Sequence, residues 1–333
     1  MIEIGVIGCG HWGPNHIRNF NLLENVKVTA CADLLHKRLE KMGELYPQIY
    51  TTVNYMNILL NKEIDAVAVA TPTSTHYDVV KRALTEGKHV LCEKPLTIAV
   101  GEAEELVELA KKLNLILMVG HVFLFNAGVK KLRELIREGQ LGEIYYIHCE
   151  RTNLGPIRDD VNSVYDLASH DIYICNYLLN SWPEKVIAKG EDFIRPGIED
   201  VAFISMSYPQ IPERVLANIH VSWLDPVKVR RITVVGSQKM VIWDDMDVVE
   251  PIRIFDKKVV KEPYYDDYGE FRLLTRDGDI HSPKIVSTEP LKEEAMHFID
   301  CIKDKKKPIC DGGDGLAVVE ILANIQASLK QNK

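Results

Sequence analysis

The glycine pattern near the N-terminus restricts the fold more than any other stretch of the chain. Residues 2–7 are mostly apolar, and Gly8, Gly10 and Gly13 follow with the spacing Gly-x-Gly-x-x-Gly before a helical pattern begins. In this context Gly8 permits a tight turn, Gly10 lets backbone approach a pyrophosphate, and Gly13 lets the helix pack closely on the strand. The free N–H groups at the start of such a helix bind phosphate. We therefore predict a dinucleotide-binding unit. The remaining motif positions, which we include among the cofactor-binding candidates, are His11 and Trp12.

An acidic residue follows the second predicted strand. That strand covers residues 26–32, and Asp33 stands 20 positions beyond Gly13. A carboxylate there accepts hydrogen bonds from the adenosine ribose hydroxyls and repels a 2′-phosphate, which favours NAD over NADP. Lys37 and Arg38 weaken this preference, because a basic side chain accommodates the extra phosphate. We predict NAD as the cofactor, NADP as the alternative, and Arg38 as a second residue near the ribose.

Strands and helices alternate through the first 120 residues. Such alternation predicts right-handed βαβ units and a parallel, doubly wound Rossmann sheet. In a sheet of this kind, ligands bind at the carboxyl ends of the strands. After the first two strands, the predicted helices cover residues 54–62, 75–86 and 99–112, and the predicted strands cover residues 65–70, 89–92 and 115–119.

One of these strand ends carries polar residues suited to a cofactor edge. Thr71 and Pro72 follow the strand over residues 65–70, and His76 stands near the start of the next helix. We predict that these three residues border the ribose and the nicotinamide. A position on the exposed surface of the helix is the alternative interpretation for His76.

The stretch Val90–Pro95 ends a buried strand abruptly. Because proline cannot donate to the ladder of a central strand, the chain must turn at Pro95. The turn leaves Glu93 and Lys94 at the carboxyl end of the strand, where we expect contact with cofactor or substrate. Taken alone, the stretch also fits a surface turn with a solvated ion pair.

The pattern changes after residue 120, where strands predominate and predict a largely antiparallel sheet. We therefore predict a dinucleotide-binding domain over residues 1–120 and an α+β domain with a large open sheet over residues 121–333. Residues 259–285 are polar and irregular, and we interpret them as an oligomer arm or a loop over the site. The predicted helices cover residues 127–138, 164–180, 289–304 and 312–330, and the predicted strands cover residues 143–152, 184–191, 199–208, 214–223, 229–236 and 239–243.

A carboxylate and an imidazole lie one turn apart in the predicted helix over residues 164–180. Asp166 and His170 are four positions apart, so they share a helical face within reach of each other. A carboxylate beside an imidazole fixes its tautomer and raises its basicity, which is typical of an acid–base pair. An ion pair on the helix surface is the alternative. His170 and Asp171 lack a further ligand at metal-binding spacing, so we predict no metal.

Composition excludes several classes of partner. The net charge of −8 argues against nucleic acid, and no apolar run reaches the roughly 18 residues of a membrane span. The first residues lack the basic region of a signal peptide. The seven cysteines are scattered and contain no Cys-x-x-Cys pair. We therefore expect reduced thiols and a cytoplasmic location.

The chain resembles the glucose–fructose oxidoreductase, inositol dehydrogenase and rhizopine-catabolism (Gfo/Idh/MocA) family over nearly its whole length. The pair Glu-Lys-Pro and, some seventy residues later, Asp-x-x-x-His is specific when both motifs occur in this order. The stretches that carry the resemblance are Gly8-Cys9-Gly10-His11-Trp12-Gly13, Ala70-Thr71-Pro72 with His76, Glu93-Lys94-Pro95, Asp166-x-x-x-His170 and Ser222-Trp223.

This resemblance implies an NAD(P)-dependent oxidoreductase with a Rossmann domain and an α/β domain, whose open sheet often carries dimer or tetramer contacts. By the same resemblance, Lys94 contacts the substrate hydroxyl and the cofactor, His170 takes the hydroxyl proton, and Asp166 orients His170. Glu93 borders the nicotinamide, and the bond from Lys94 to Pro95 is often cis.

The substrate is the least constrained prediction. Arg151, Asn153, Arg158 and Asn162 precede the Asp166 helix, and together with His170 we predict them as substrate contacts, the arginines suiting a phosphate or carboxylate. The segment over residues 153–171 resembles enzymes that oxidise the 3-hydroxyl of UDP-linked N-acetylhexosamines or their uronic acids. An inositol or free-hexose dehydrogenase is the alternative, and a non-catalytic NAD(H)-binding regulator is the alternative from another class. A contact between Arg158 and a UDP-sugar predicts that Arg158→Ala raises KM for that substrate and leaves KM for a neutral polyol nearly unchanged.

Overall fold

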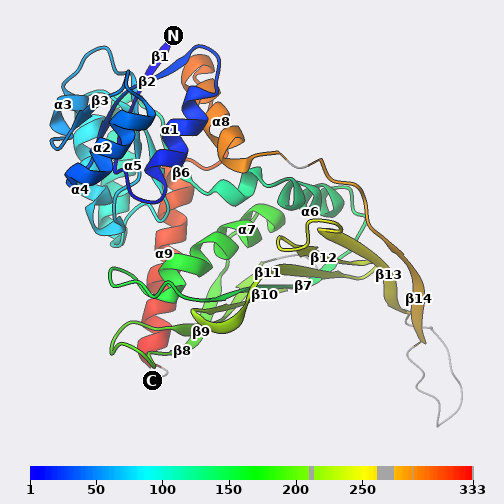
Figure 1. Cartoon of the computed structure of the whole chain (residues 1–333). Helices are drawn as coiled ribbons and strands as arrows, with labels where there is room; N and C mark the ends of the chain where they lie inside the picture. Colours follow the sequence, from blue (N-terminus) through cyan, green and yellow to red (C-terminus); the bar gives the residue numbers. More distant parts are fainter. Residues whose placement is uncertain (210–213, 261–273, 287, 332–333) are drawn as a thin grey trace, which may run out of the picture. The chain divides into compact units, whose positions relative to one another are not determined.

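The computed structural model describes residues 1–209, 214–260, 274–286 and 288–331, and the chain folds into two compact units. The first unit comprises Met1–Phe125 and Thr288–Ala323, and the second comprises Asn126–Ser287 and Asn324–Lys333. The hydrophobic pattern did not indicate that Thr288–Ala323 belongs with the N-terminal part, because an amphipathic helix does not specify its partner. Figure 1 shows both units and labels their elements where there is room.

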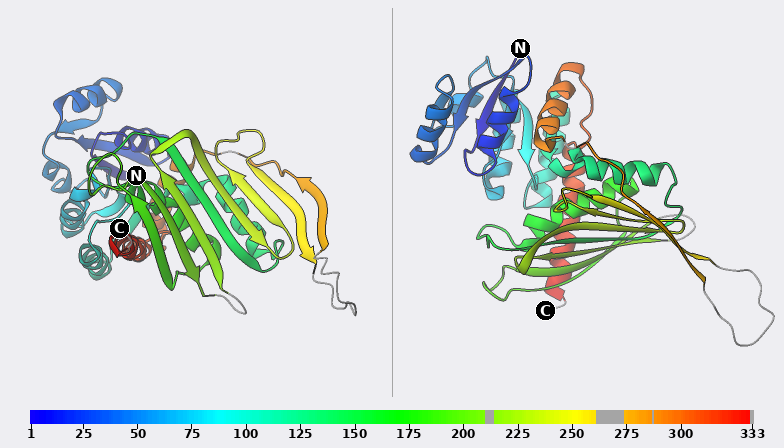
Figure 2. Two further views of the ribbon diagram at one scale, coloured as in Figure 1. Left: turned by 90° about the horizontal axis from the view of Figure 1, so that it is seen from below. Right: turned by 45° about the vertical axis from the view of Figure 1, so that its right-hand side comes forward.

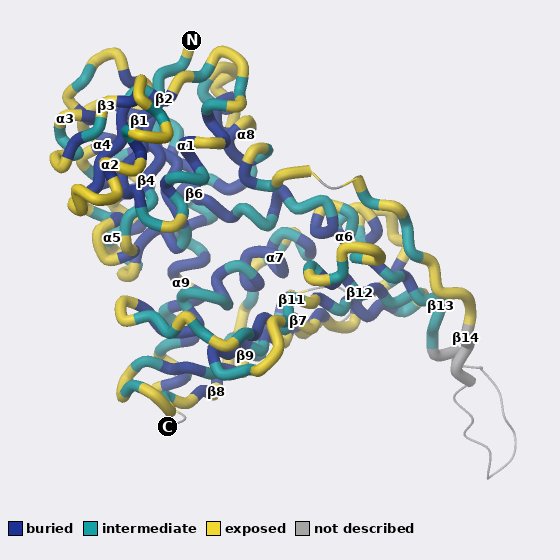
Figure 3. The backbone as a smooth tube through the Cα atoms, in the orientation of Figure 1, coloured by how far each residue is buried: buried dark blue, intermediate teal, exposed yellow. Residues whose placement is uncertain are grey.

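The first unit is built on a six-stranded parallel sheet with the order β3-β2-β1-β4-β5-β6. This is the strand order of the classical Rossmann fold, so the predicted fold class is confirmed for this unit. The central strands are short apolar runs because both faces of a parallel sheet are covered there, and Figure 3 shows this core as buried. The strands are β1 (Ile2–Ile7), β2 (Val26–Ala32), β3 (Tyr50–Thr52), β4 (Ala66–Val69), β5 (His89–Glu93) and β6 (Leu117–Gly120).

Helices flank this sheet. The sequence did not predict α2 or β3, whose segments are rich in charged and polar residues. Helix α8 packs on α1 through a ring contact between Phe20 and Phe298, with centroids 6.4 Å apart, and an ion pair between Arg18 and Glu289. The helices are α1 (Gly13–Asn21), α2 (His36–Leu45), α3 (Met56–Leu59), α4 (His76–Thr85), α5 (Val100–Leu113), α8 (Pro290–Asp304) and the first part of α9 (Gly312–Gln331), with 3-10 turns η1 (Thr73–Thr75) and η2 (Val122–Phe125).

The second unit contains an eight-stranded sheet with the order β14-β13-β12-β11-β7-β10-β9-β8. Its neighbouring strands are antiparallel except β7 and β10, which confirms the predicted mostly antiparallel open sheet. The strands are β7 (Ile144–Leu154), β8 (Lys185–Glu191), β9 (Val201–Tyr208), β10 (Val215–Ser222), β11 (Leu224–Gly236), β12 (Met240–Asp244), β13 (Ile252–Val260) and β14 (Leu274–His281).

The segment predicted to be irregular, residues 259–285, is partly regular. Strands β13 and β14 pair antiparallel and include its two ends, from Ile252 to Val260 and from Leu274 to His281. Strand β13 carries alternating apolar residues, of which Ile252 and Ile254 are buried, whereas β14 is mostly polar and shows no such alternation. The middle of the segment, residues 261–273, lies outside the described residues, and so does the interpretation of it as an arm or a loop over the site.

Helices α6 (Ala127–Arg137) and α7 (Ser169–Leu179) lie on one face of the second sheet (Figure 2). No helix of the described residues covers the other face. The helix predicted over residues 164–180 begins with a π-helical turn, η3 (Val164–Ala168), before it continues as α7. Single π turns inside helices are frequent at functional sites.

Candidate active site

The carboxyl ends of the parallel strands bring several predicted residues to one edge of the first unit. Because the strands run in the same direction, the residues that follow β1, β2, β4, β5 and β6 lie along a common edge. The residues at this edge are Gly8, Asp33, Thr71, Pro72, Lys94 and His121.

The glycine-rich loop has the geometry of a pyrophosphate cradle. Gly8 has a φ of +96°, and a Cβ there would lie 2.6 Å from the carbonyl oxygen of Ala70. A Cβ on Gly13 would lie 1.9 Å from the carbonyl oxygen of Gly8. At Gly10, in contrast, the nearest atom to a Cβ is Nη1 of Arg38, 3.8 Å away. The loop is packed tightly against backbone at Gly8 and Gly13 and has open space beside Gly10. The glycine-rich loop therefore fits the pyrophosphate of a dinucleotide. His11 is exposed and Trp12 is half-buried beside this loop.

Asp33 links the glycine loop to the end of β2. Its carboxylate accepts hydrogen bonds from the backbone N–H of Cys9 at 2.8 Å and of Leu35 at 2.9 Å. Nη1 of Arg38 lies 3.2 Å from Oδ2 of Asp33. Asp33 thus lies at the end of β2 beside the glycine loop and pairs with Arg38, whose positive charge it offsets. Its contact with the ribose stays a prediction.

Glu93 and Lys94 follow the buried part of β5, and the bond from Lys94 to Pro95 is cis as expected. Oε1 of Glu93 lies 2.9 Å from Nε2 of His16, a buried residue of α1. The backbone N–H of Lys94 donates to Oε2 of Glu93 at 3.3 Å. Glu93 is buried and paired with His16, so the alternative of a solvated surface ion pair is wrong.

His121 is a neighbour of Lys94 that the sequence interpretation missed. It directly follows β6 and is buried. Burial and the positive charge of Lys94 lower the pKa of His121 to about 3. His121 is therefore a neutral imidazole at neutral pH. Its position directly after a strand at the ligand edge was the signal that could have revealed it.

His76 connects the turns that follow β4 and β5. Nδ1 lies 2.9 Å from the carbonyl oxygen of Pro95, and Nε2 lies 2.9 Å from the carbonyl oxygen of Thr71. The side chain is 1% exposed, so the interpretation of His76 as a surface residue is wrong. Both ring nitrogens lie next to backbone carbonyl oxygens, so His76 connects Thr71 to Pro95. Its place beside the cofactor stays a prediction.

Helix α8 adds a buried carboxyl group that the sequence interpretation also missed. Glu294 is fully buried, and neither of its carboxyl oxygens has a hydrogen-bond partner among the described residues. Burial, and to a smaller extent the charge of Glu93, raises the pKa of Glu294 well above its ordinary value. Glu294 therefore retains its proton in the folded chain at a pH at which the unfolded chain has lost it.

We expect Glu294→Gln to stabilise the protein at pH 8. A raised carboxyl pKa in the folded state lowers stability as pH rises from the unfolded-state value through the folded-state value. The neutral amide removes this pH dependence, so the free energy of unfolding should increase by about 1 kcal/mol or more at pH 8 and little at pH 5. Thermal unfolding at pH 5 and at pH 8 measures the change in the free energy of unfolding. Asp300→Asn is the control, because Asp300 lies on the exposed side of α8. Equal effects of Glu294→Gln at both pH values would contradict the prediction.

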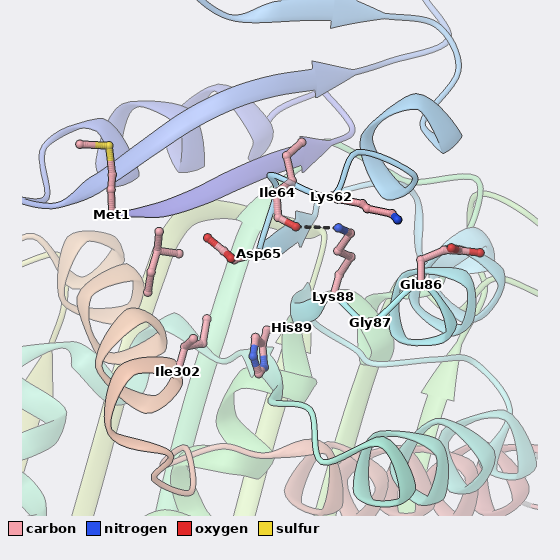
Figure 4. Close-up of a pocket in the computed structure, with 10 residues that line it drawn as sticks. Met1, Lys62, Ile64, Asp65, Glu86, Gly87, Lys88, His89 and Ile302 are labelled. Atoms are coloured by element: carbon pink, nitrogen blue, oxygen red, sulfur yellow. Dashed lines mark hydrogen bonds between the residues drawn. The ribbon is translucent and has the colours of Figure 1, made fainter.

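A hollow of about 450 Å³ lies at the other edge of the parallel sheet, where its strands begin (Figure 4). Ile2, Asp65 and His89 line it, together with Lys88, whose Nζ donates to the carbonyl oxygens of Asn61 and Ile64 at 2.7 and 2.6 Å. It is separate from the edge that carries the glycine loop and Lys94.

The second unit holds Asp166 and His170. Asp166 belongs to the π turn η3, and His170 is the second residue of α7, so the predicted one-turn spacing lies at the junction of two helix types. Nη1 of Arg158 donates to Oδ1 of Asp166 at 3.0 Å, and Nε1 of Trp223 donates to Oδ2 at 3.2 Å. Asp166 and His170 are both partly exposed, so a ligand can reach them.

Two of the predicted substrate residues are engaged inside the protein instead. The guanidinium of Arg151 is buried and forms two 2.8 Å bonds with the carboxylate of Asp171, which corrects its predicted substrate contact. Nδ2 of Asn162 donates to Glu199 at 2.7 Å and to Gln326 at 2.8 Å, and Oδ1 accepts from the N–H of Tyr165. Asn162 therefore positions the start of η3. Asn153, which is half-buried, donates to the carbonyl oxygen of Gly155.

Three further findings concern the described residues only. No group of three or more His, Cys, Asp or Glu side chains among them could hold a metal ion. No helix among them has the length and apolar character that a membrane span requires. All seven cysteines are free and buried.

Comparison with known proteins identifies the family to which both parts of the chain belong. The profile of an oxidoreductase family with an NAD-binding Rossmann fold matches residues 2–121, and the Gfo/Idh/MocA C-terminal domain matches residues 129–242. The chain belongs to the Gfo/Idh/MocA family. Its first unit is the NAD-binding Rossmann domain of this family, and the chain is an NAD(P)-dependent oxidoreductase.

Gfo/Idh/MocA relatives of different specificity match along the whole chain. The myo-inositol 2-dehydrogenase of Thermotoga maritima is 25% identical, with 100% of this chain and 97% of that protein covered. The UDP-N-acetylglucosamine 3-dehydrogenase of Acidithiobacillus ferrooxidans is 24% identical, with 99% and 97% covered. The solved structure of the latter matches with a TM-score of 0.81 at 23% identity, covering 99% of this chain and 98% of that one, and shows a shared fold.

Proposed function

We propose that this Gfo/Idh/MocA protein oxidises a secondary hydroxyl of a sugar, with C3 of a UDP-N-acetylhexosamine or its uronic acid as the reacting carbon. The observation that carries the chemistry is the position of Lys94 at the same strand edge as the glycine loop and Asp33. The 3-dehydrogenase relative, which is 24% identical, supports the sugar nucleotide. The myo-inositol 2-dehydrogenase relative, which is equally similar, supports inositol or a free hexose as the alternative.

The proposed chemistry divides between a cation and a base. When bound, the nicotinamide cofactor takes up the hydride. Loss of a hydride from a secondary alcohol also requires a base for the hydroxyl proton and a positive charge to stabilise the developing alkoxide. We assign the positive charge to the ammonium of Lys94 and the base to the imidazole of His170. Asp166 orients His170, and Glu93 borders the nicotinamide side.

We expect Asp33→Asn to weaken the preference for NAD over NADP by about 10- to 100-fold, the effect of losing a charged hydrogen-bond acceptor. The amide keeps the shape of the side chain and removes the charge that repels a 2′-phosphate. The ratio of kcat/KM for the two cofactors measures this preference. Arg38→Ala is the opposing control, because it leaves the carboxylate of Asp33 without its cation and should lower NADP use further. A ratio unchanged in both variants would place the ribose elsewhere.

The substrate is tested with the purified protein, NAD and four compounds: UDP-N-acetylglucosamine, its uronic acid, myo-inositol and glucose. NADH absorbance and mass spectrometry of the products distinguish the hypotheses, and 2-oxoglutarate is added to reoxidise retained NADH. A 3-keto sugar nucleotide supports the proposed function. Turnover of inositol or glucose alone supports the alternative. NAD binding without any turnover across the panel would leave the fold assignment in place and require other substrates to be tested.

We also propose that the uncovered face of the second sheet joins two copies of the chain, in a dimer or tetramer located in the cytoplasm. Strand pairing places four exposed apolar side chains on this face: Tyr146, Ile187, Phe203 and Leu216. Phe203 also stacks on His220, with ring centroids 4.4 Å apart. An apolar face with interspersed polar residues is typical of interfaces between identical chains.

We expect Phe203→Asp to dissociate the oligomer, because a charge at the centre of an apolar interface loses its hydration. Light scattering after size-exclusion chromatography gives the mass at several concentrations. Ile194→Asp is the matched control, since Ile194 is equally apolar and exposed but lies outside the strands. A wild-type chain that is monomeric at all concentrations would refute the proposed interface.

A further inference from the structure

The loop between β7 and η3 holds the carboxylate of Asp166 from one side. Arg158 donates from Nη1 to Oδ1 of Asp166 at 3.0 Å. Its other nitrogens form a two-pronged contact with Asp160, from Nε at 2.9 Å and from Nη2 at 2.6 Å. A guanidinium is planar and rigid, so the contact with Asp160 fixes the direction in which Nη1 points. Arg158 therefore meets Asp166 in a geometry that its own loop sets.

Trp223 holds the same carboxylate from another element. It directly follows β10, is fully buried, and donates from its indole nitrogen to Oδ2 of Asp166 at 3.2 Å. Its backbone is fixed as well, since its N–H donates to the carbonyl oxygen of Asp200 and its carbonyl oxygen accepts from Gly155. An indole N–H is a donor only, so this contact requires an acceptor at Oδ2. Each oxygen of Asp166 thus has a donor fixed by separate parts of the fold.

We propose that Arg158 and Trp223 are positioning residues that hold Asp166 as an oriented carboxylate beside His170, and that Arg158 is not primarily a substrate contact. This inference rests on the proposed role of His170 as the base. A cation on one oxygen and a hydrogen-bond donor on the other restrict the rotation of the Asp166 carboxylate. The cation also offsets part of the negative charge that His170 experiences from Asp166. Arg158 would then limit how strongly Asp166 favours the protonated imidazole.

Two pairs of opposite charge lie near this site. Arg151 and Asp171, the residue after His170, form a buried ion pair, and Arg195 pairs with Asp159 while donating to the carbonyl oxygen of Arg158 at 3.2 Å. Each pair joins opposite charges, so it adds little net field at Asp166. The remaining acidic groups packed behind the loop are Asp160, held by Arg158, and the buried Glu199 and Asp200.

The experiment measures the titration of His170 and the kinetics in three variants of the full chain: Arg158→Ala, Arg158→Lys and Trp223→Phe. NMR follows the histidine ring signals against pH, and His170→Gln identifies the signal of His170. We expect Arg158→Ala to raise the pKa of His170, because Asp166 loses its cation. With the substrate found in the panel, the acid limb of the pH profile of kcat should shift upward by the same amount. At pH 7 kcat should fall about tenfold while KM changes less than threefold.

The variants separate positioning from other roles. Arg158→Lys should keep the wild-type pKa of His170 and part of the wild-type kcat. Lysine keeps the positive charge but cannot form the two-nitrogen contact with Asp160. Trp223→Phe should lower kcat less, because it removes a neutral donor. Arg195→Ala loosens the same loop but leaves both donors to Asp166, and it should leave the titration of His170 unchanged. A tenfold rise in KM for a UDP-sugar, with kcat and the titration unchanged in Arg158→Ala, would overturn the inference in favour of a substrate contact.

Failure of the proposed function gives a different result. A wild-type chain that turns over none of the panel compounds contradicts the proposed function, while the NMR titration still tests the arrangement around Asp166. A titration of His170 that is the same in the wild type and in Arg158→Ala contradicts the inference even if the dehydrogenase activity is confirmed.

Discussion

Lys94→Ala is expected to lower kcat by about a thousandfold, within the range of 10²- to 10⁴-fold typical of a positioned acid–base group. Lys94 follows β5 at the strand edge that also carries the glycine loop, and its charge contributes to the low pKa of the buried His121 nearby. Removing the ammonium leaves the developing alkoxide without its cation. Steady-state kinetics on the substrate found in the panel measures kcat, and isothermal titration measures the affinity for NAD, which should change less than threefold.

Lys62→Ala is the matched control, because Lys62 lines the hollow at the opposite edge of the same sheet. Its turnover and NAD affinity should equal those of the wild type. Lys94→Arg keeps a positive charge and should retain more activity than Lys94→Ala. If Lys94→Ala left the activity of the protein untouched, the assigned cation would be wrong and a regulator that senses NAD(H) would become the better explanation.

The first unit could be predicted from the sequence because its decisive contacts are encoded locally. The spacing Gly8, Gly10 and Gly13 between a strand and a helix has one common physical explanation, and the structure shows the close approaches that require glycine at Gly8 and Gly13. The position of Asp33 after the second strand likewise follows from the length of one βαβ unit. The right-handed crossovers then restrict the topologies that such a sheet can adopt.

Side-chain direction was harder to predict in the second unit. Arg151 belongs to β7, in which Ile147 and Cys149 are buried at alternate positions, so a period of two already placed Arg151 on the buried face. The charge of Arg151 suggested contact with a ligand instead. Its partner, Asp171, stands 20 positions later in the sequence, so the local pattern did not indicate this pair. Asn162 precedes a helical segment, where its side chain caps the N–H of Tyr165, a local signal for structure.

Contacts between residues far apart in the sequence were harder to predict in the first unit. His16 lies on the same helical face as the buried Phe20 and Gly13, which predicts burial, yet nothing in the sequence indicates that Glu93 is its partner. Glu294 is acidic on the apolar face of α8, and only the fold shows that Glu93 lies near enough to influence it. Such contacts depend on how helices are assigned to units, which the hydrophobic pattern does not specify.

Gly13→Ala is expected to abolish NAD binding and to lower the free energy of unfolding by about 3 kcal/mol, a large effect for one methyl group. The added Cβ would lie 1.9 Å from the carbonyl oxygen and 2.9 Å from the carbonyl carbon of Gly8. Both atoms are backbone, so relief requires the turn after β1 to move away from α1. The same movement would open the cradle for the pyrophosphate. Urea unfolding and titration with NAD measure the two effects.

Two other glycines separate packing from cofactor approach. A Cβ on Gly10 would meet only Arg38, at 3.8 Å, so Gly10→Ala should cost less than about 1 kcal/mol of stability while still lowering NAD affinity, because the methyl group occupies the opening toward the pyrophosphate. Gly43, inside α2, has nothing within 4 Å, and Gly43→Ala should increase stability slightly and leave NAD affinity unchanged. A Gly10→Ala variant that binds NAD normally would place the pyrophosphate away from this loop. A stable Gly13→Ala variant that binds NAD would contradict the close contact between Gly13 and Gly8 on which the cradle depends.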